Sequence, residues 1–237
     1  MKQLERVEQQ FNFKYPELYK KLYDDGMLDW KAEEYGPNWY ATYWKEFEKN
    51  PPLLLFANDI ELIDFKRIKE EIEAFKNPED YRQTKPEFCF VPIAQTGAGD
   101  LYVFQFDKAD GENVPITLLY HDEINGVILA KNLQDFIFRQ MLECVVELDE
   151  KYSRAMSNDL KTNLFNMLRT HKPYLTQRQV EKLEEIYNRD LFEYKYKVPN
   201  GREFSATGLI SRNELEEILN QEIGFEELDK EFVYMGE

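Results

Sequence analysis

Residues 88–130 read FCFVPIAQTGAGDLYVFQFDKADGENVPITLLYHDEINGVILA, and this stretch decides the fold. It contains four apolar runs separated by segments rich in Gly, Asp and Asn, the residues that tight turns between strands require. In the second run, aromatic residues at every other position predict a half-buried strand: Tyr102, Phe104 and Phe106. The short connections predict that these strands form an antiparallel meander.

Apolar residues at helical spacing predict two helices before the meander. The first helix has Leu4, Val7 and Phe11 on one face. The second is expected to open at Pro16, which suits a first helical position, and to stop near Gly26.

Three further elements are predicted between the second helix and the meander. Aromatic residues at helical spacing predict a short helix within residues 39–47, and the run LLLFA at 53–57 is typical of a buried strand. A longer helix is expected to be capped by Asn58 or Asp59 and to run to about Phe75.

The meander is followed by mostly helical sequence. Asn132 is expected to cap the next helix, and Thr176 and Ser211 stand at the first position of capping-box patterns. A hairpin is predicted near 192–207, with its turn at Asn200-Gly201. The order of elements predicts an α+β fold with a mainly antiparallel sheet and helices packed around it. We expect a domain over residues 1–148 and a largely helical extension over residues 149–237.

The composition is that of a globular protein with a strong excess of acid. The 237 residues can bury a core without a disulfide or a metal ion, and 46 Asp and Glu against 30 Lys and Arg leave a net charge of −16. Nucleic acids and anionic membranes are poor partners for such a chain, because phosphate binding requires Lys and Arg. A basic protein partner suits this charge; the alternative is a solvated surface that keeps the chain soluble.

The two cysteines and the N-terminus indicate a reducing compartment. Cys89 and Cys144 lie in apolar runs, so both are expected to be buried reduced thiols. The first eleven residues are charged throughout and lack the apolar core of a signal peptide. We therefore expect a cytoplasmic protein.

Residue patterns that support catalysis or ligand binding are missing. His121 and His171 are expected to be solvent-facing turn residues, and the cysteines and histidines lack the paired spacing of a zinc site. No serine lies in a GxSxG motif, and the GxG at residues 97–99 lacks the third glycine and the helix of a nucleotide-binding loop. We expect no catalytic residue, no cofactor and no metal ion. A hydrolase that uses an unrecognised carboxylate pair remains the alternative.

Three segments together resemble the SUKH superfamily, which includes the fungal Smi/Knr cell-wall regulators and many bacterial immunity proteins. They are YPELYKKLYDDGML at 15–28, FVPIAQTGAGDLYVFQFD at 90–107 and VPITLLYHDEINGVILAKNLQDFIFRQML at 114–142. The resemblance covers about residues 1–148. Its structural motif positions correspond to Pro16, Gly26, Gly99 and Asp100.

The resemblance implies an α+β domain that acts by binding protein. Bacterial members are thought to bind and neutralise a cognate polymorphic toxin, often a nuclease with a cationic surface. The expected function is therefore that of a non-enzymatic immunity protein. The alternative is a scaffold or regulatory module that binds cell-wall or signalling proteins, as fungal members do. The oligomeric state stays open.

A surface for a cationic partner should combine aromatic anchors with carboxylates. Two regions of the sequence have this combination, one in the segment between residues 24 and 44 and one in two turns of the meander. The expected partner-binding residues are Asp24, Asp25, Asp29, Trp30, Glu33, Glu34, Trp39 and Trp44 in the first region and Asp110, Glu112, Asp122 and Glu123 in the second.

Overall fold

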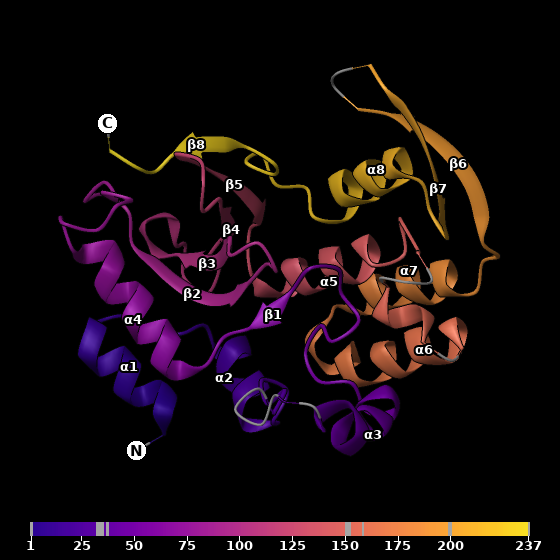
Figure 1. Ribbon diagram of the computed structural model, residues 1–237, viewed down its shortest axis with the longest axis horizontal. Coiled ribbons are helices and arrows are strands. Elements are labelled where there is room, and N and C mark those ends of the chain that lie inside the picture. The colour runs from indigo at the N-terminus through magenta and orange to yellow at the C-terminus, as the bar shows by residue number, and fades with distance from the viewer. Residues whose placement is uncertain are drawn as a thin grey trace. The chain divides into compact units, whose positions relative to one another are not determined.

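The computed structural model confirms the α+β class (Figure 1). It describes residues 2–31, 36, 38–149, 153–157, 159–198 and 201–236.

The chain divides into two compact units that interleave along the sequence. The sheet unit comprises residues 1–33, 59–136 and 225–237, and the helical unit comprises residues 34–58 and 137–224.

The sheet unit is built on a six-stranded antiparallel sheet with the strand order β1-β2-β3-β4-β5-β8. The strands are β1 (Glu61–Leu62), β2 (Phe90–Gln95), β3 (Leu101–Gln105), β4 (Ile116–Leu119), β5 (Asn125–Ala130) and β8 (Glu231–Val233). The four central strands form the predicted meander, and the two short edge strands were not predicted.

Helices cover both faces of this sheet. They are α1 (Gln3–Phe11), α2 (Glu17–Asp24), α4 (Phe65–Lys76) and the first residues of α5 (Leu133–Glu143). Phe75 of α4 packs on Phe90 with ring centroids 5.6 Å apart, and on the opposite face Tyr19 of α2 packs on Phe104 at 5.4 Å. The expectation that β3 is half-buried was wrong, because all five of its residues are buried between these layers.

The predicted start of α4 was also wrong. Residues 61–62 pair with β2 as strand β1, so the helix begins only at Phe65. Its cap is Asp64, whose carboxylate accepts a hydrogen bond from the backbone N–H of Arg67 at 2.7 Å. Asp59 instead accepts the backbone N–H of Gly97 at 2.7 Å, which fastens the β2–β3 turn.

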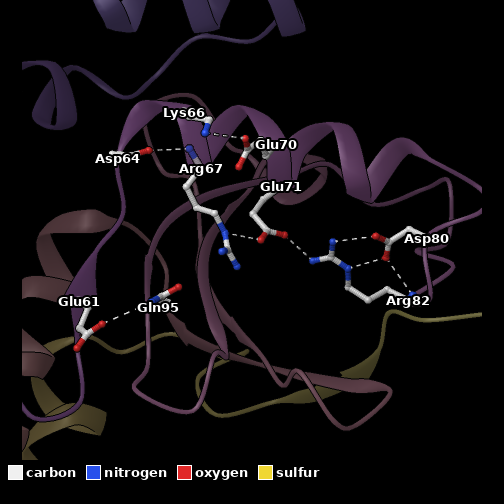
Figure 2. A network of polar contacts seen from close by, with 9 residues as sticks. All are labelled: Glu61, Asp64, Lys66, Arg67, Glu70, Glu71, Asp80, Arg82 and Gln95. Carbon is white, nitrogen blue, oxygen red and sulfur yellow. Dashed lines mark hydrogen bonds and ion pairs between the residues drawn. The ribbon is translucent and has the colours of Figure 1, made fainter. Parts of the chain in front are cut away.

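A buried ionic network joins α4 to the loop that follows it (Figure 2). The Arg82 guanidinium donates to Glu71 and to Asp80, each at 2.8 Å, and Arg67 also forms an ion pair with Glu71 at 2.7 Å. The Arg82 side chain is only 8% exposed and lies 4.6 Å from the centre of the Phe75 ring. The network therefore links the loop to α4.

The helical unit contains short and long helices and a two-stranded sheet. They are a π-helix (Tyr40–Trp44), α3 (Lys45–Lys49), two 3-10 turns (Arg154–Met156 and Lys172–Tyr174), α6 (Leu160–His171), α7 (Gln177–Tyr187), α8 (Arg212–Glu222), β6 (Phe192–Lys197) and β7 (Glu203–Gly208).

One of the two predicted capping boxes is confirmed, and half of the other is present. Thr176 and Gln179 form the predicted capping box of α7, and the Ser211 hydroxyl accepts the backbone N–H of Glu214 at 3.2 Å. The predicted hairpin is present as β6 and β7, with Asn200 of its turn outside the described residues. None of the helices in the described ranges has both the length and the apolar character needed to cross a bilayer.

The run at residues 53–57 is buried but is not a strand. Its backbone forms successive turns, with the N–H of Ala57 donating to the carbonyl of Leu54 at 2.9 Å. The N–H of Leu54 donates to Nε2 of His171 at 3.0 Å. The His171 side chain thus accepts a backbone hydrogen bond that a neighbouring strand would accept if this run were a strand.

His171 is therefore a core residue and not the solvent-facing turn residue that we expected. The side chain is fully buried, and its Nδ1 lies 2.8 Å from the carbonyl oxygen of Met167. Burial lowers the pKa of His171 to about 4, so the imidazole is neutral and uses both nitrogens to hold the helical unit together.

The cysteine expectation is half right. Cys144 is buried, Cys89 is exposed, and both are free thiols. Cys89 precedes β2, and its backbone N–H donates to the carboxylate of Asp107 at 2.8 Å. The apolar run FCFVPI suggested that Cys89 is buried in the strand, but β2 begins one residue after it, at Phe90.

Candidate partner-binding surface

The strand register separates the two groups of turn carboxylates. Leu101 pairs with Leu119, so the β2–β3 and β4–β5 turns lie at one end of the sheet. The loop that joins β3 to β4 lies at the other end. Asp122 and Glu123 therefore occupy one end, and Asp110 and Glu112 occupy the opposite end.

Asp100 joins the two turns at the first end. Its carboxylate accepts the backbone N–H of His121 at 2.9 Å and lies 2.7 Å from His121 Nδ1. The β2–β3 turn itself is closed by Thr96, whose hydroxyl accepts the N–H of Asp100 at 3.0 Å. Gly99 has a φ of +103°, a left-handed backbone that favours glycine.

The contact between Asp100 and His121 shifts both acid–base equilibria. The hydrogen bond to Asp100 raises the pKa of His121. Partial burial works against the charged form of Asp100, but the hydrogen bonds from His121 outweigh it and lower the pKa of that carboxyl. Both changes favour the ion pair.

Asp100 and His121, together with Asp122, also form a group in the described ranges that could hold a metal ion. The potential ligand atoms of Asp100, His121 and Asp122 all lie within 4.8 Å of one another. His121 Nδ1 is already in contact with Asp100, however, so the arrangement serves the link between the turns.

Strand β8 brings distant acidic residues to the same end. Phe232 and Tyr234 face the core next to Phe90, at 6.4 Å and 5.9 Å, so Glu231 and Val233 point to the other face of the sheet. The hydroxyl of Tyr234 donates to the carbonyl of Tyr120 at 2.9 Å, which ties β8 to the β4–β5 turn.

Several of these carboxylates lie near Tyr120. Partial burial is the main cause that raises its pKa, and the negative charges of nearby carboxylates add to it: Glu231, Glu123, Asp100 and Asp229. Ile124 and Val233 are 52% and 42% exposed. An aromatic ring and two exposed aliphatic side chains thus sit among acids, the combination that suits a cationic protein surface. We call this set the acidic corner: Asp100, Tyr120, Asp122, Glu123, Ile124, Asp229, Glu231 and Val233.

The excess of acid belongs mainly to the unit that carries this corner. The sheet unit has 28 Asp and Glu against 15 Lys and Arg, a net charge of −13. The helical unit has 18 against 15, a net charge of −3. Long-range attraction of a cation is therefore directed to the sheet unit.

The described part of the first predicted region combines exposed carboxylates with two buried tryptophans. Asp24, Asp25 and Asp29 are exposed, but each is paired with a lysine, at distances between 2.5 and 3.0 Å. Trp30 and Trp39 are 2% and 5% exposed, so they are core residues and not accessible anchors.

Other residues of that region differ in exposure. Trp44 is half-buried against Phe56, and Tyr40, which the sequence did not single out, is 62% exposed. Glu33 and Glu34 lie outside the described residues.

At the far end of the sheet, Asp110 and Glu112 are exposed. The Glu112 carboxylate accepts the backbone N–H of Glu17 at 2.8 Å and so caps the first turn of α2. Among the structural motif residues, Pro16 precedes α2 as its cap residue, and Gly26 follows it with a φ of +74°.

Comparison with known proteins identifies the family. No curated protein and no solved structure is significantly similar to the chain. The family model described as "SMI1 / KNR4 family (SUKH-1)" matches residues 2–139, which is more than half of the chain and includes strands β1 to β5. The order of helices, meander and helix found in the structure agrees with the segments that suggested the SUKH superfamily. The chain therefore belongs to the SMI1 / KNR4 family (SUKH-1).

Proposed function

We propose that this protein is a non-enzymatic immunity protein that binds and neutralises a cationic toxin domain in the cytoplasm. The acidic corner is the observation that carries the proposal. It offers Tyr120, Ile124 and Val233 for close contact, and carboxylates around them for steering and register. Family membership supports a protein-binding role, and the net charge of −13 on the sheet unit favours a basic partner.

Neutralisation requires only that the corner cover the surface that the toxin uses. A nuclease domain presents Lys and Arg to phosphate, and an acidic protein competes for the same side chains. The binding partner would reach the site quickly at low salt and more slowly as salt screens the attraction. No covalent step and no cofactor enter this mechanism.

Co-expression with the toxin domain encoded next to its gene tests the proposal. The parent protein should restore growth and bind the purified domain. The double variant Glu123→Lys/Glu231→Lys should lower the association rate by about tenfold and weaken its salt dependence. The matched control Glu181→Lys/Glu184→Lys changes the net charge equally on exposed positions of α7 and should leave protection intact.

The outcomes separate the two protein-binding functions. If the parent protects no cell and purifies with a cell-wall or signalling protein of its own host, the regulatory alternative replaces the immunity function. If the corner variant protects as well as the control does, the toxin binds another surface.

A further inference from the structure

The β6–β7 hairpin lies outside the residues matched by the family, and within the described ranges no other strand pairs with the outer edge of β6. It forms a separate two-stranded sheet in the helical unit, with β6 as its outer strand (Figure 1). The edge of β7 is already used, because the carbonyl of Thr207 accepts the backbone N–H of Leu148 at 2.8 Å. An isolated pair of strands is only marginally stable, so further strand pairing at β6 is favourable.

The hydrogen-bond pattern shows which groups of β6 face outward. The carbonyl of Thr207 points out of the hairpin, and the register places Glu193 opposite Thr207. In an antiparallel pair, two opposed residues both face inward or both face outward. The backbone groups of Glu193, Lys195 and Lys197 therefore point to the open side, and all three side chains are exposed.

The charges along this edge are complementary to themselves. A second β6 strand can be placed antiparallel to the first with a two-fold axis at Tyr194. Glu193 then lies opposite the second copy's Lys195, and Lys195 lies opposite the second copy's Glu193. Both residues have outward backbone groups, so the pairing also forms hydrogen bonds. A two-fold axis at Lys195 would instead place two lysines face to face, which is unfavourable.

The aromatic face of the hairpin suits the same arrangement. Phe192, Tyr194, Tyr196 and Phe204 form a continuous row, with successive ring centroids 5.7, 6.1 and 5.9 Å apart. Phe192 and Phe204 are 41% and 45% exposed. With the axis at Tyr194, Phe192 lies opposite the second copy's Tyr196, and the aromatic row continues across the interface.

We propose that two copies of this chain associate through their β6 edges into a four-stranded antiparallel sheet with the two-fold axis at Tyr194. This association does not depend on toxin binding, since the acidic corner belongs to the other unit. It makes the protein a homodimer in which each protomer keeps its own corner.

Sedimentation velocity of the full chain tests the proposal. The parent should form a dimer of twice 28.5 kDa at micromolar concentration. Glu193→Lys and Lys195→Glu should each raise the dimer Kd by about tenfold or more, because two opposed pairs become like-charged. The charge-swapped double variant E193K/K195E should return to the parent value. Lys197→Glu is the control, since Lys197 lies opposite the second copy's Leu191.

A parent that stays monomeric up to about 100 µM overturns the proposal. A dimer that none of these charge reversals weakens also overturns it. The same holds if the double variant E193K/K197E restores the parent dimer Kd and E193K/K195E does not. Circular dichroism of each variant shows whether the fold is retained.

Disulfide trapping gives a second readout that does not depend on charge. In a Cys89→Ser background, Tyr194→Cys places two thiols opposite each other at the axis, in a pair without mutual backbone hydrogen bonds and with close Cα atoms. Mild oxidation should then give a covalent dimer, while Tyr196→Cys, which faces the second copy's Phe192, should give little. Equal cross-linking of both variants would contradict the proposed register.

Discussion

At the scale of single residues, the two histidines show how surroundings set protonation. His171 is buried between backbone groups, and its pKa is lowered to about 4. His121 is partly exposed, and the hydrogen bond to Asp100 raises its pKa. His121 therefore gives stability that is present at low pH and lost as the pH rises through its folded pKa. His171 has the opposite dependence, because the folded protein disfavours its proton.

We expect His171 to reduce stability on acidification. Its pKa of about 4 in the folded protein lies below the ordinary value of 6.5, so the unfolded chain takes up the proton first. The contribution of His171 to the free energy of unfolding is complete above pH 6.5. It declines by about 3 kcal/mol in all as the pH falls from 6.5 to the folded pKa. In His171→Gln, the free energy of unfolding should depend less on pH between these limits.

Denaturant titrations at several pH values measure this difference. Parent and variant must be compared at each pH, because the many carboxylates also titrate below pH 5 and affect both proteins alike. Parallel curves for the two proteins would show that His171 is not held neutral.

At the scale of elements, the loop after α4 depends on one guanidinium. Arg82 donates to Glu71 and Asp80, and these carboxylates are only 11% and 15% exposed. Removal of the cation leaves Asp80 without its guanidinium partner and Glu71 with Arg67 alone, in a largely dry site (Figure 2). The pair Lys66–Glu70 on the same helix has side chains 83% and 57% exposed, where water replaces a lost partner.

Arg82→Ala should therefore lower the free energy of unfolding by about 3 kcal/mol. The control Lys66→Ala should change it by no more than about 0.5 kcal/mol, since exposed pairs contribute little. Urea denaturation of the two variants beside the parent measures both values. Equal losses would mean that the network in Figure 2 does not hold the loop.

The elements that the sequence predicted are those encoded by neighbouring residues. The meander strands, the α7 capping box and the hairpin each follow from a pattern within about fifteen residues. The missed elements depend on distant partners. β1 and β8 are two and three residues long and exist because β2 and β5 offer free edges. Residues 53–57 look like a strand, but His171, more than a hundred positions away, completes their hydrogen bonding.

The candidate surface was only half predictable for the same reason. Asp122 and Glu123 were predicted to lie in a turn and are exposed, but aromatic anchors were expected only in the other region, among its tryptophans. Trp30 and Trp39 are core and Trp44 is half-buried, whereas Tyr120 comes into the site because β8 places Glu231 near it. The acidic last segment was visible in the sequence, but its return to the sheet was not.

At the scale of the whole molecule, the return of the chain to the sheet unit is the main feature of the architecture. After α8, residues 225–237 leave the helical unit and close the sheet with β8. Tyr234 is 1% exposed and belongs to a core cluster with Phe90, Val103 and Leu119. The family-matched region therefore takes part of its core from sequence beyond residue 139.

A chain that ends at Gly224 should consequently lose the cooperative unfolding of the sheet unit. Point variants distinguish the effect of lost core packing from the effect of a shortened chain. Tyr234→Ala should cost about 3 kcal/mol, because it empties a packed core position. Val233→Ala, on the exposed face of the same strand, should cost no more than about 0.5 kcal/mol. Thermal unfolding of all three proteins checks this, and a fully stable shortened chain would contradict it.

The interleaving of the units also orders events during protein synthesis. The ribosome releases α1 to β5 first, but the nascent sheet keeps an unpaired β5 edge until the whole helical unit and then β8 have emerged. About a hundred residues, including most of the helical unit, separate the two strands that must pair, and such distant pairing is slow. The acidic corner, which needs Glu231 and Val233, is thus the last part of the sheet unit to form, because it is complete only after β8 has emerged.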